Sequence, residues 1–453
     1  MFLELALGSL LALCLGTAKS RKLSLLFCRF LFAWGMLFFE RRIWTKLLGL
    51  PGPLPRDLDE VTADRLDGIL KAHGVITEHE QVIKVVKLQP ITSEPDKQLT
   101  AGSIRVFVQP PTTTTTAGEV RELALFCKFQ TGRGMPLFLQ AVRWAAEYDV
   151  AREVDFYNKI QPKLDPKQVK TSRPILAMKS PLLNYVFVIL EHLDLGQSSH
   201  HRVVNDYEGA TVSEVQAMLV SAAHLHQAFP VDAPEVAWIP AKRELEFAKW
   251  VESFSPPRET RAFSPKIWQA LREYFTSKPV TLVHGDFRPG NMIFQGSDRD
   301  NVEGVLVSDW EATNVGPSLW DFTYLTTLGW SAKARRAHQS QQLAQYLANL
   351  APHQQQAAKG GEEDLVLLVL LLGFVSRTIR VNKFWSNQGN TTKDQGCWLI
   401  RVCLALGDVN AKQAASLLPG VDESDIAALQ AQALRETQDL FAGREPLKRW
   451  EEI

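Results

Sequence analysis

The pattern of apolar and polar positions predicts strands in the first half of the chain and helices in the second. Short apolar or alternating runs are typical of strands, and they occur at residues 82–88, 103–108, 123–129 and 185–190. Apolar residues spaced by three and four predict helices over 62–72, 140–160, 212–229, 245–254, 265–275, 332–350 and 362–383. A strand-rich region followed by a helix-rich region predicts an α+β fold with two lobes.

The first 50 residues differ from the rest because they are mostly apolar. Two apolar runs, residues 2–17 and 23–39, come before a proline-rich break at 51–55, and each is about the minimum length for a membrane span. A cleaved signal peptide is disfavoured, because the first run contains Glu4 and is not preceded by a basic residue. A helical hairpin would place its two basic clusters on opposite sides of the membrane.

One membrane-inserted segment followed by an interfacial helix keeps all the basic residues on the cytosolic side. We favour this arrangement over a helix at 23–39 that packs on the folded domain. The chain is then expected to contain a membrane-associated segment (1–50), a strand-rich N-lobe (51–190) and a helical C-lobe (191–453). Membrane association through residues 2–39 would leave the lobes facing the cytosol, and a soluble cytoplasmic protein is the alternative.

The composition argues against nucleic-acid binding and indicates a reducing compartment. Lys plus Arg equals Asp plus Glu at 50 each, and no basic run with aromatic residues occurs, so nucleic-acid binding is not expected. The five cysteines have neither disulfide-framework nor metal-ligand spacing. Cys127 lies within a strand-like run, where a reduced, buried thiol is expected. The apolar run 365–372 is too short to cross a membrane and predicts a buried core helix.

Polar groups gather around a predicted hairpin that begins near residue 280. Strands are expected at 280–283, 291–294 and 304–308, with turn-forming residues at 296–301. If the turn centres near Asp300, Asn291 and Asp309 are equidistant from it and face each other across the hairpin. Amide and carboxylate oxygens suit Mg²⁺, so Asn291 and Asp309 are the predicted metal ligands.

Asp286 lies five residues before Asn291, which is the interval found in the catalytic loop of kinases. Phosphoryl transfer from a magnesium nucleotide to a hydroxyl needs one carboxylate for the hydroxyl proton and further oxygen ligands for the metal. Asp286 is therefore the candidate catalytic residue, and His284 is expected to be a structural hydrogen-bonding residue. Arg288 either touches phosphate or is a solvated loop arginine.

These motifs resemble a known family. The run from His284 to Asn291 (His-Gly-Asp-Phe-Arg-Pro-Gly-Asn), the run 308–317 and the Trp320-Asp321 pair resemble the aminoglycoside phosphotransferase and choline kinase superfamily. Within it the chain looks most like the ecdysteroid-kinase-like (CHK kinase-like) branch. The resemblance implies a two-lobed, protein-kinase-like fold over about residues 60–410, with Asp321 bracing the catalytic loop.

Two further kinase parts can be assigned by role. Lys128 is a lone charge in an apolar strand, which is costly unless it is paired, and it is the candidate for contact with the α- and β-phosphates. The run 151–157 resembles the family's Glu-x-x-Phe-Tyr signature, so Glu153 is its expected partner, with Glu147 as the alternative. The resemblance also implies backbone contacts from Glu191 and Leu193 to adenine.

Together these residues predict a phosphotransferase that uses ATP and Mg²⁺ and acts on a small-molecule alcohol. A catalytically inactive nucleotide-binding scaffold at a membrane is the first alternative. A metal-dependent hydrolase and a protein kinase are weaker ones, because a His-rich ligand set and an Ala-Pro-Glu motif are missing from the sequence. Sterols, amino alcohols, sugars and antibiotics all remain open as acceptors, and no oligomeric state is predicted.

Overall fold

The chain forms two compact units. The computed structural model describes residues 60–87, 101–110, 120–130, 152–179, 186–191, 200–230, 233–236, 265–276, 280–350, 361–381 and 393–441. Unit 1 contains the described residues up to Asn158 and those within Ser172–Leu193, and unit 2 contains Lys159–Thr171 and those after Asp194. The predicted membrane segment, the helix at 245–254 and most of the helix at 140–160 lie outside the described residues.

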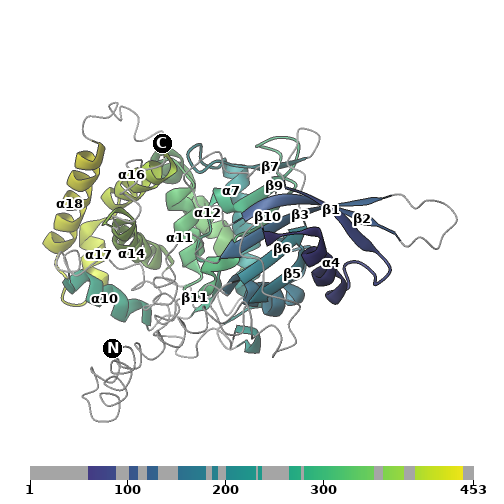
Figure 1. The fold of residues 1–453 in the computed structure, drawn as a ribbon. Helices are drawn as coiled ribbons and strands as arrows, with labels where there is room; N and C mark the ends of the chain where they lie inside the picture. The colour runs from purple at the N-terminus through teal and green to yellow at the C-terminus, as the bar shows by residue number, and fades with distance from the viewer. Residues whose placement is uncertain are drawn as a thin grey trace, which may run out of the picture. The chain divides into compact units, whose positions relative to one another are not determined.

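Unit 1 is built on a five-stranded antiparallel sheet with the order β1-β2-β3-β6-β5 (Figure 1). The strands are β1 (Gln81–Lys87), β2 (Ala101–Gln109), β3 (Arg121–Gln130), β5 (Pro174–Lys179) and β6 (Val186–Glu191). The four strands predicted from the sequence are therefore confirmed. The fifth, β5, was not predicted, since its six residues do not alternate clearly between apolar and polar.

One face of this sheet is covered by helix α4 (Ala63–Ala72), which begins where the Thr62 side chain accepts a hydrogen bond from Arg65 N–H. The buried residues of α4 and of alternate sheet positions form one core. Cys127 is part of this core as a free thiol, as expected, and burial raises its pKa to about 12. Helix α6 (Arg152–Asp155) follows in the chain and contacts β5.

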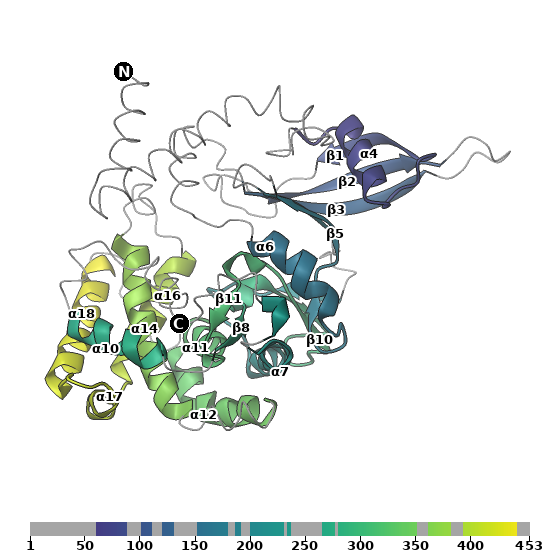
Figure 2. The ribbon, with the colours of Figure 1, turned by 90° about the horizontal axis from the view of Figure 1, so that it is seen from below.

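Unit 2 combines two small sheets with eight helices among its described residues. One sheet has the order β4-β10-β9-β7. The other pairs β11 with β8 (Figure 2). These strands are β4 (Lys170–Thr171), β7 (His201–Val203), β8 (Thr281–Val283), β9 (Met292–Gln295), β10 (Gly304–Val307) and β11 (Asn314–Gly316). The strands β4, β7 and β11 have two or three residues each, too few for a periodic signal in the sequence.

The helices of unit 2 pack around α11, which contacts α7, α12, α14 and α16. They are α7 (Val212–Ala228), α10 (Pro265–Thr276), α11 (Leu319–Leu328), α12 (Ala332–Ala348), α14 (Gly361–Val381), α16 (Lys393–Gly407), α17 (Ala411–Leu417) and α18 (Glu423–Phe441). A capping box between Thr211 and Glu214 fixes the start of α7. The α+β class predicted from the sequence is confirmed by this division into a sheet-based unit and a helix-rich unit.

Helix α14 carries the apolar run that the sequence analysis assigned to the core. Its residues from Leu367 to Leu372 are all buried, as predicted, whereas Leu365 and Val366 are half-buried. Among the residues that the structure describes, no helix combines the length and hydropathy needed to span a membrane.

Candidate active site

The hairpin of β9 and β10 is shifted by one residue from the register that the sequence analysis expected. The paired residues run from Gly304 with Gln295 to Val307 with Met292, so the next pair is Ser308 with Asn291. The N–H and Oγ of Ser308 both donate to the Asn291 carbonyl, at 3.0 and 2.8 Å. The predicted direct pairing of Asn291 with Asp309 was therefore wrong.

The turn explains the shift. The Asp298 carboxylate accepts hydrogen bonds from the N–H groups of Asp300 and Asn301, and it therefore stabilises a turn that begins earlier than the sequence suggested. Gly296 has a φ of +141°, and an added Cβ would lie 2.0 Å from the Asn301 carbonyl oxygen. The hairpin consequently folds about the Arg299–Asp300 bond rather than about Asp300.

Asp309 lies two residues after Val307, the last residue of β10, and has a left-handed backbone conformation, with φ 63° and ψ 63°. Among the described residues, Asp309 is the one non-glycine residue with a positive φ. At the end of a strand this conformation changes the chain direction, so Asp309 does not follow the alternation of β10. A strained residue of this kind is common in ligand sites.

The first end of the catalytic loop is held by a buried carboxylate. Asp321, in α11, accepts hydrogen bonds from the N–H groups of His284 (2.8 Å) and Gly285 (3.0 Å). Its Oδ2 also lies 3.0 Å from His226 Nε2, and His226 Nδ1 lies 2.6 Å from the Tyr346 hydroxyl. The bracing role predicted for Asp321 is confirmed. The structural role predicted for His284 agrees with its ring bond to the Ser308 carbonyl.

Asp286 and Asn291 are brought together inside this loop. The Asn291 Nδ2 donates to the Asp286 carbonyl at 2.9 Å and to its Oδ2 at 2.8 Å. Asn291 is only 4% exposed. Since both bonds use its amide nitrogen, its Oδ1 is left as the atom that can coordinate a cation. The donor chemistry of Asn291 and Asp309 therefore fits a magnesium site.

Arg288 is not a solvated loop residue, which corrects one of the two expectations for it. Its Nε donates to both Asp286 oxygens at 3.2 and 3.1 Å, and its Nη1 donates to Asp206. The guanidinium lies 5.0 Å from the centre of the Trp398 ring, a favourable cation–π arrangement. Asp206 also accepts the Gly290 N–H at 2.7 Å.

Sequence reasoning missed Asp206 entirely. It lies in a polar turn 82 residues before Arg288, and the sequence around it carries no periodicity that could link the two positions. At Gly290 an added Cβ would come within 2.6 Å of both Asp206 Oδ2 and Arg288 Nη1. Such a contact is visible only once the fold is known.

The charges of these residues act on one another. Burial opposes the charge of Arg288, but the carboxylates of Asp286 and Asp206, with contributions from Tyr324 and Asp309, raise the pKa of its guanidinium. Burial raises the pKa of Asp206, against the influence of Arg288. Burial, the charge of Asp286 and a hydrogen bond to it raise the pKa of Tyr324 well above its usual value. Arg288 therefore stays charged and offsets part of the negative charge of Asp286 and Asp206.

In unit 1 the structure brings the predicted lysine and glutamate together. Lys128 lies on β3, the central strand, and its Nζ is 2.8 Å from Glu153 Oε2. The two side chains are 12% and 2% exposed. The alternative partner, Glu147, lies outside the described residues. Glu191 ends β6 and its N–H donates to the Arg173 carbonyl, whereas Leu193 lies outside the described residues.

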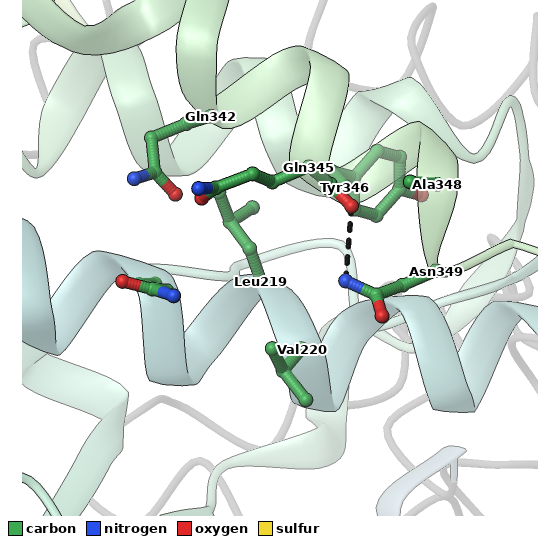
Figure 3. A pocket seen from close by; sticks show the side chains of 8 residues that line it. Leu219, Val220, Gln342, Gln345, Tyr346, Ala348 and Asn349 are labelled. Carbon is green, nitrogen blue, oxygen red and sulfur yellow. Dashed lines mark hydrogen bonds between the residues drawn. The ribbon is translucent and has the colours of Figure 1, made fainter.

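A separate cavity of about 260 Å³ lies between α7 and α12 in unit 2. Leu219 and Val220 line it from α7, and Gln342 and Gln345 line it from α12 (Figure 3). Its lining contains amides and apolar groups but no carboxylate or basic side chain. It therefore lacks the groups that phosphoryl transfer requires, and the candidate active site is the loop 284–291.

The chain is similar in part to several solved structures. Choline kinase LicA from Streptococcus pneumoniae is 16% identical, with 78% of this chain and 99% of that chain covered at a TM-score of 0.41. Amicoumacin kinase hAmiN is 10% identical, with 79% and 96% covered at 0.41. A choline/ethanolamine kinase family protein from Mesorhizobium loti is 13% identical, with 81% and 99% covered at 0.37. All three TM-scores are below 0.5.

A comparison with curated proteins gives no significant match. The family model described as the phosphotransferase enzyme family matches residues 125–358, which is more than half of the 453 residues. The match extends from the strand that carries Lys128 past the catalytic loop to the residues after α12. The predicted superfamily and the predicted class of enzyme are thereby confirmed, and the chain belongs to the phosphotransferase enzyme family.

Proposed function

We propose that this protein is a kinase that uses ATP and Mg²⁺ to phosphorylate a hydroxyl group of a small molecule. The observation that carries the proposal is the catalytic loop, in which Asn291 closes onto Asp286 while Asp321 holds the loop start by two backbone amides. Kinases need a carboxylate and an amide at this interval, fixed before substrate binds.

Asp286 is proposed to orient the acceptor hydroxyl and to accept its proton. Its carboxylate is 26% exposed, so it can be reached by a substrate while its position is fixed by Asn291 and Arg288. Asn291 Oδ1 and the Asp309 carboxylate are proposed to hold Mg²⁺. When bound, the metal neutralises charge that builds up on the β- and γ-phosphate oxygens.

The remaining nucleotide contacts are proposed to come from unit 1. Lys128 would contact the α- and β-phosphates, and the buried Glu153 carboxylate fixes the lysine position. At the end of β6, the Glu191 N–H already donates to Arg173, so its carbonyl is the group proposed to meet adenine. Leu193, two residues later, is the proposed second backbone contact.

The finer assignments rest on the sequence. The motifs at 284–291 and 308–317 favour the CHK kinase-like branch, and the apolar residues 2–39 favour association with a membrane, with the catalytic units in the cytosol. Deletion of residues 1–50 is expected to move the protein from the membrane fraction to the supernatant and to leave MgATP binding intact. An unchanged distribution would contradict the membrane proposal but not the kinase proposal.

The reaction is tested by a screen of hydroxylated metabolites with MgATP, read out as the mass gain of one phosphate. Asp286→Asn should lower turnover by about 100-fold or more, the usual contribution of a positioned acid or base, while MgATP still binds. Asp300→Asn, an exposed turn residue, is the control with the same change of charge. Full activity in the Asp286 variant would overturn the role of this residue.

The inactive scaffold makes the opposite prediction. It would bind MgATP in a thermal shift assay but would transfer no phosphate to any acceptor or to water. The family match does not support this alternative, since the matched family is one of enzymes.

A further inference from the structure

The loop that carries Asp286 and Asn291 is held at both ends by buried carboxylates. The proposed function gives a role to the first of them, Asp321, but none to the second, Asp206. Asp321 binds the first end through the His284 and Gly285 N–H groups. Asp206, only 5% exposed, binds the second end through the Gly290 N–H at 2.7 Å and through Arg288. Gly290 directly precedes the proposed metal ligand Asn291.

The orientation of Arg288 explains what Asp206 does. The guanidinium binds two carboxylates: its Nε donates to both Asp286 oxygens, and its Nη1, on the other side of the group, donates to Asp206. Without Asp206, Nη1 would lose its carboxylate partner among these contacts, and the guanidinium could rotate and draw its Nε away from Asp286. Asp286 would then lose a contact that fixes its carboxylate relative to the acceptor hydroxyl.

Asp206 is itself fixed by a distant helix. Arg401, in α16 and 2% exposed, donates from Nη1 to the Asp206 carbonyl at 2.7 Å and from Nη2 to the Tyr207 carbonyl at 3.1 Å. Its Nη1 also donates to the Leu328 carbonyl at the end of α11. The turn that presents Asp206 is thus joined to the same helix, α11, that carries Asp321.

We propose that Asp206 is a positioning residue for phosphoryl transfer: it holds Arg288, and through Arg288 it fixes the orientation in which the Asp286 carboxylate meets the acceptor hydroxyl. This inference rests on the proposed kinase function. In the step it assists, the hydroxyl proton passes to Asp286 and the acceptor oxygen forms a bond to the γ-phosphorus. The bond from that phosphorus to the bridging oxygen breaks, and ADP leaves with the electron pair.

The test is a double-mutant cycle with MgATP as the probe, followed as ADP release to water and to any acceptor that the screen identifies. Asp206→Asn keeps the size of the side chain and an oxygen for the Gly290 N–H. We expect kcat to fall by about 10- to 100-fold, because small displacements of a reacting group have effects of this size. KM for MgATP should change by less than about 2-fold, since a change in KM would indicate lost uniform binding.

Arg288→Gln should produce a similar loss, and the double variant Asp206→Asn with Arg288→Gln should be no worse than the Arg288 variant alone. Residues that act through one another show this lack of additivity. Losses that multiply in the double variant, or an unchanged kcat in Asp206→Asn, would overturn the inference while leaving the kinase proposal intact. A wild-type chain that transfers no phosphate would overturn both.

A second variant covers the case in which Asp206→Asn does not fold. Gly290→Ala leaves every charge in place but puts a Cβ within 2.6 Å of Asp206 Oδ2 and Arg288 Nη1. It should reproduce the loss of kcat with unchanged KM, and Asp300→Asn, exposed in the hairpin turn, should leave both constants unchanged. Wild-type kcat in Gly290→Ala would count against the inference, and the melting temperatures of all variants identify unfolding as a cause.

Discussion

Asp309 holds a left-handed backbone conformation, which costs most L-residues about 1–2 kcal/mol. Asparagine and aspartate tolerate it best, because their short polar side chains can bond to the local backbone. The position therefore has two separable requirements. The backbone needs a residue that accepts a positive φ, and the proposed chemistry needs a carboxylate.

Two substitutions separate these requirements. Asp309→Asn should keep the melting temperature close to wild type but weaken MgATP binding by about tenfold or more, since a charged ligand to the metal is lost. Asp309→Ala should weaken binding as much and also lower the free energy of unfolding by about 1 kcal/mol. Thermal unfolding and titration with MgATP measure the two effects, and equal stability of the two variants would show that the conformation is not strained.

At the scale of elements, the catalytic loop joins β8 to the β9–β10 hairpin and depends on α11 for its shape. Asp321 is fully buried and satisfies two loop amides and His226 at once. A buried carboxylate with these partners is fixed in one orientation, and it transmits that orientation to the loop. The loop conformation is thus set by a helix that begins about thirty residues after the loop.

Asp321→Asn should therefore reduce both stability and turnover. The amide cannot accept all three bonds with a full negative charge, and hydrogen bonds to charged groups contribute about 1.5–3 kcal/mol each. We expect a loss of about 2–3 kcal/mol in urea unfolding and a fall in kcat. Thr326→Ser, also in α11 and buried, is the matched control and should leave kcat unchanged. Wild-type turnover in Asp321→Asn would show that the loop keeps its shape without this anchor.

The ion pair between Lys128 on β3 and Glu153 on α6 allows a test of whether Lys128 serves stability or nucleotide binding. Breaking a buried ion pair on one side costs about 3–5 kcal/mol, whereas replacing both partners by apolar residues is often neutral. Glu153→Gln should therefore destabilise the protein, and the double variant Lys128→Met with Glu153→Leu should recover stability. Neither should bind MgATP with wild-type affinity. Normal nucleotide affinity in the recovered double variant would show that Lys128 has no role in binding.

At the scale of the whole molecule, the chain divides into two compact units, each with its own buried thiols among the described residues. Cys127 lies in the sheet of unit 1, and Cys397 and Cys403 lie in α16 of unit 2. Burial raises the pKa of Cys127 to about 12 and also raises that of Cys403. A thiol with a raised pKa remains protonated at pH 8, and the thiolate is the reactive form.

These cysteines can report the unfolding of each unit. At pH 8 the native protein should show no alkylation of Cys127 or Cys403 within minutes, and both should react fully in denaturant. Labelling at intermediate urea concentrations, read by peptide mass spectrometry, should follow the unfolding of unit 1 at Cys127 and of unit 2 at Cys403. Rapid native labelling of Cys127 would contradict its burial in the sheet.

Much of this organisation could be predicted from local features of the sequence. Strands β1, β2, β3 and β6 have clear apolar runs, and α4, α7, α10, α12 and α14 have apolar residues at helical spacing. The loop residues Asp286 and Asn291 were found because their interval is fixed by chemistry within one short segment. Lys128 was found because a lone charge in an apolar strand requires a partner.

Other features depended on contacts that no local pattern encodes. The one-residue shift of the hairpin came from the side chain of Asp298, which competes for the turn amides. Asp206 and Arg401 lie 195 residues apart and meet through a backbone carbonyl, which carries no sequence signature. The sequence by itself determined the class of fold, the main elements and the chemical groups of the loop, because periodicity and short intervals are properties of neighbouring residues. Only the tertiary structure decided the register, the second anchor of the loop at Asp206 and the partners of Arg288, because these follow from packing between segments that are distant in the chain.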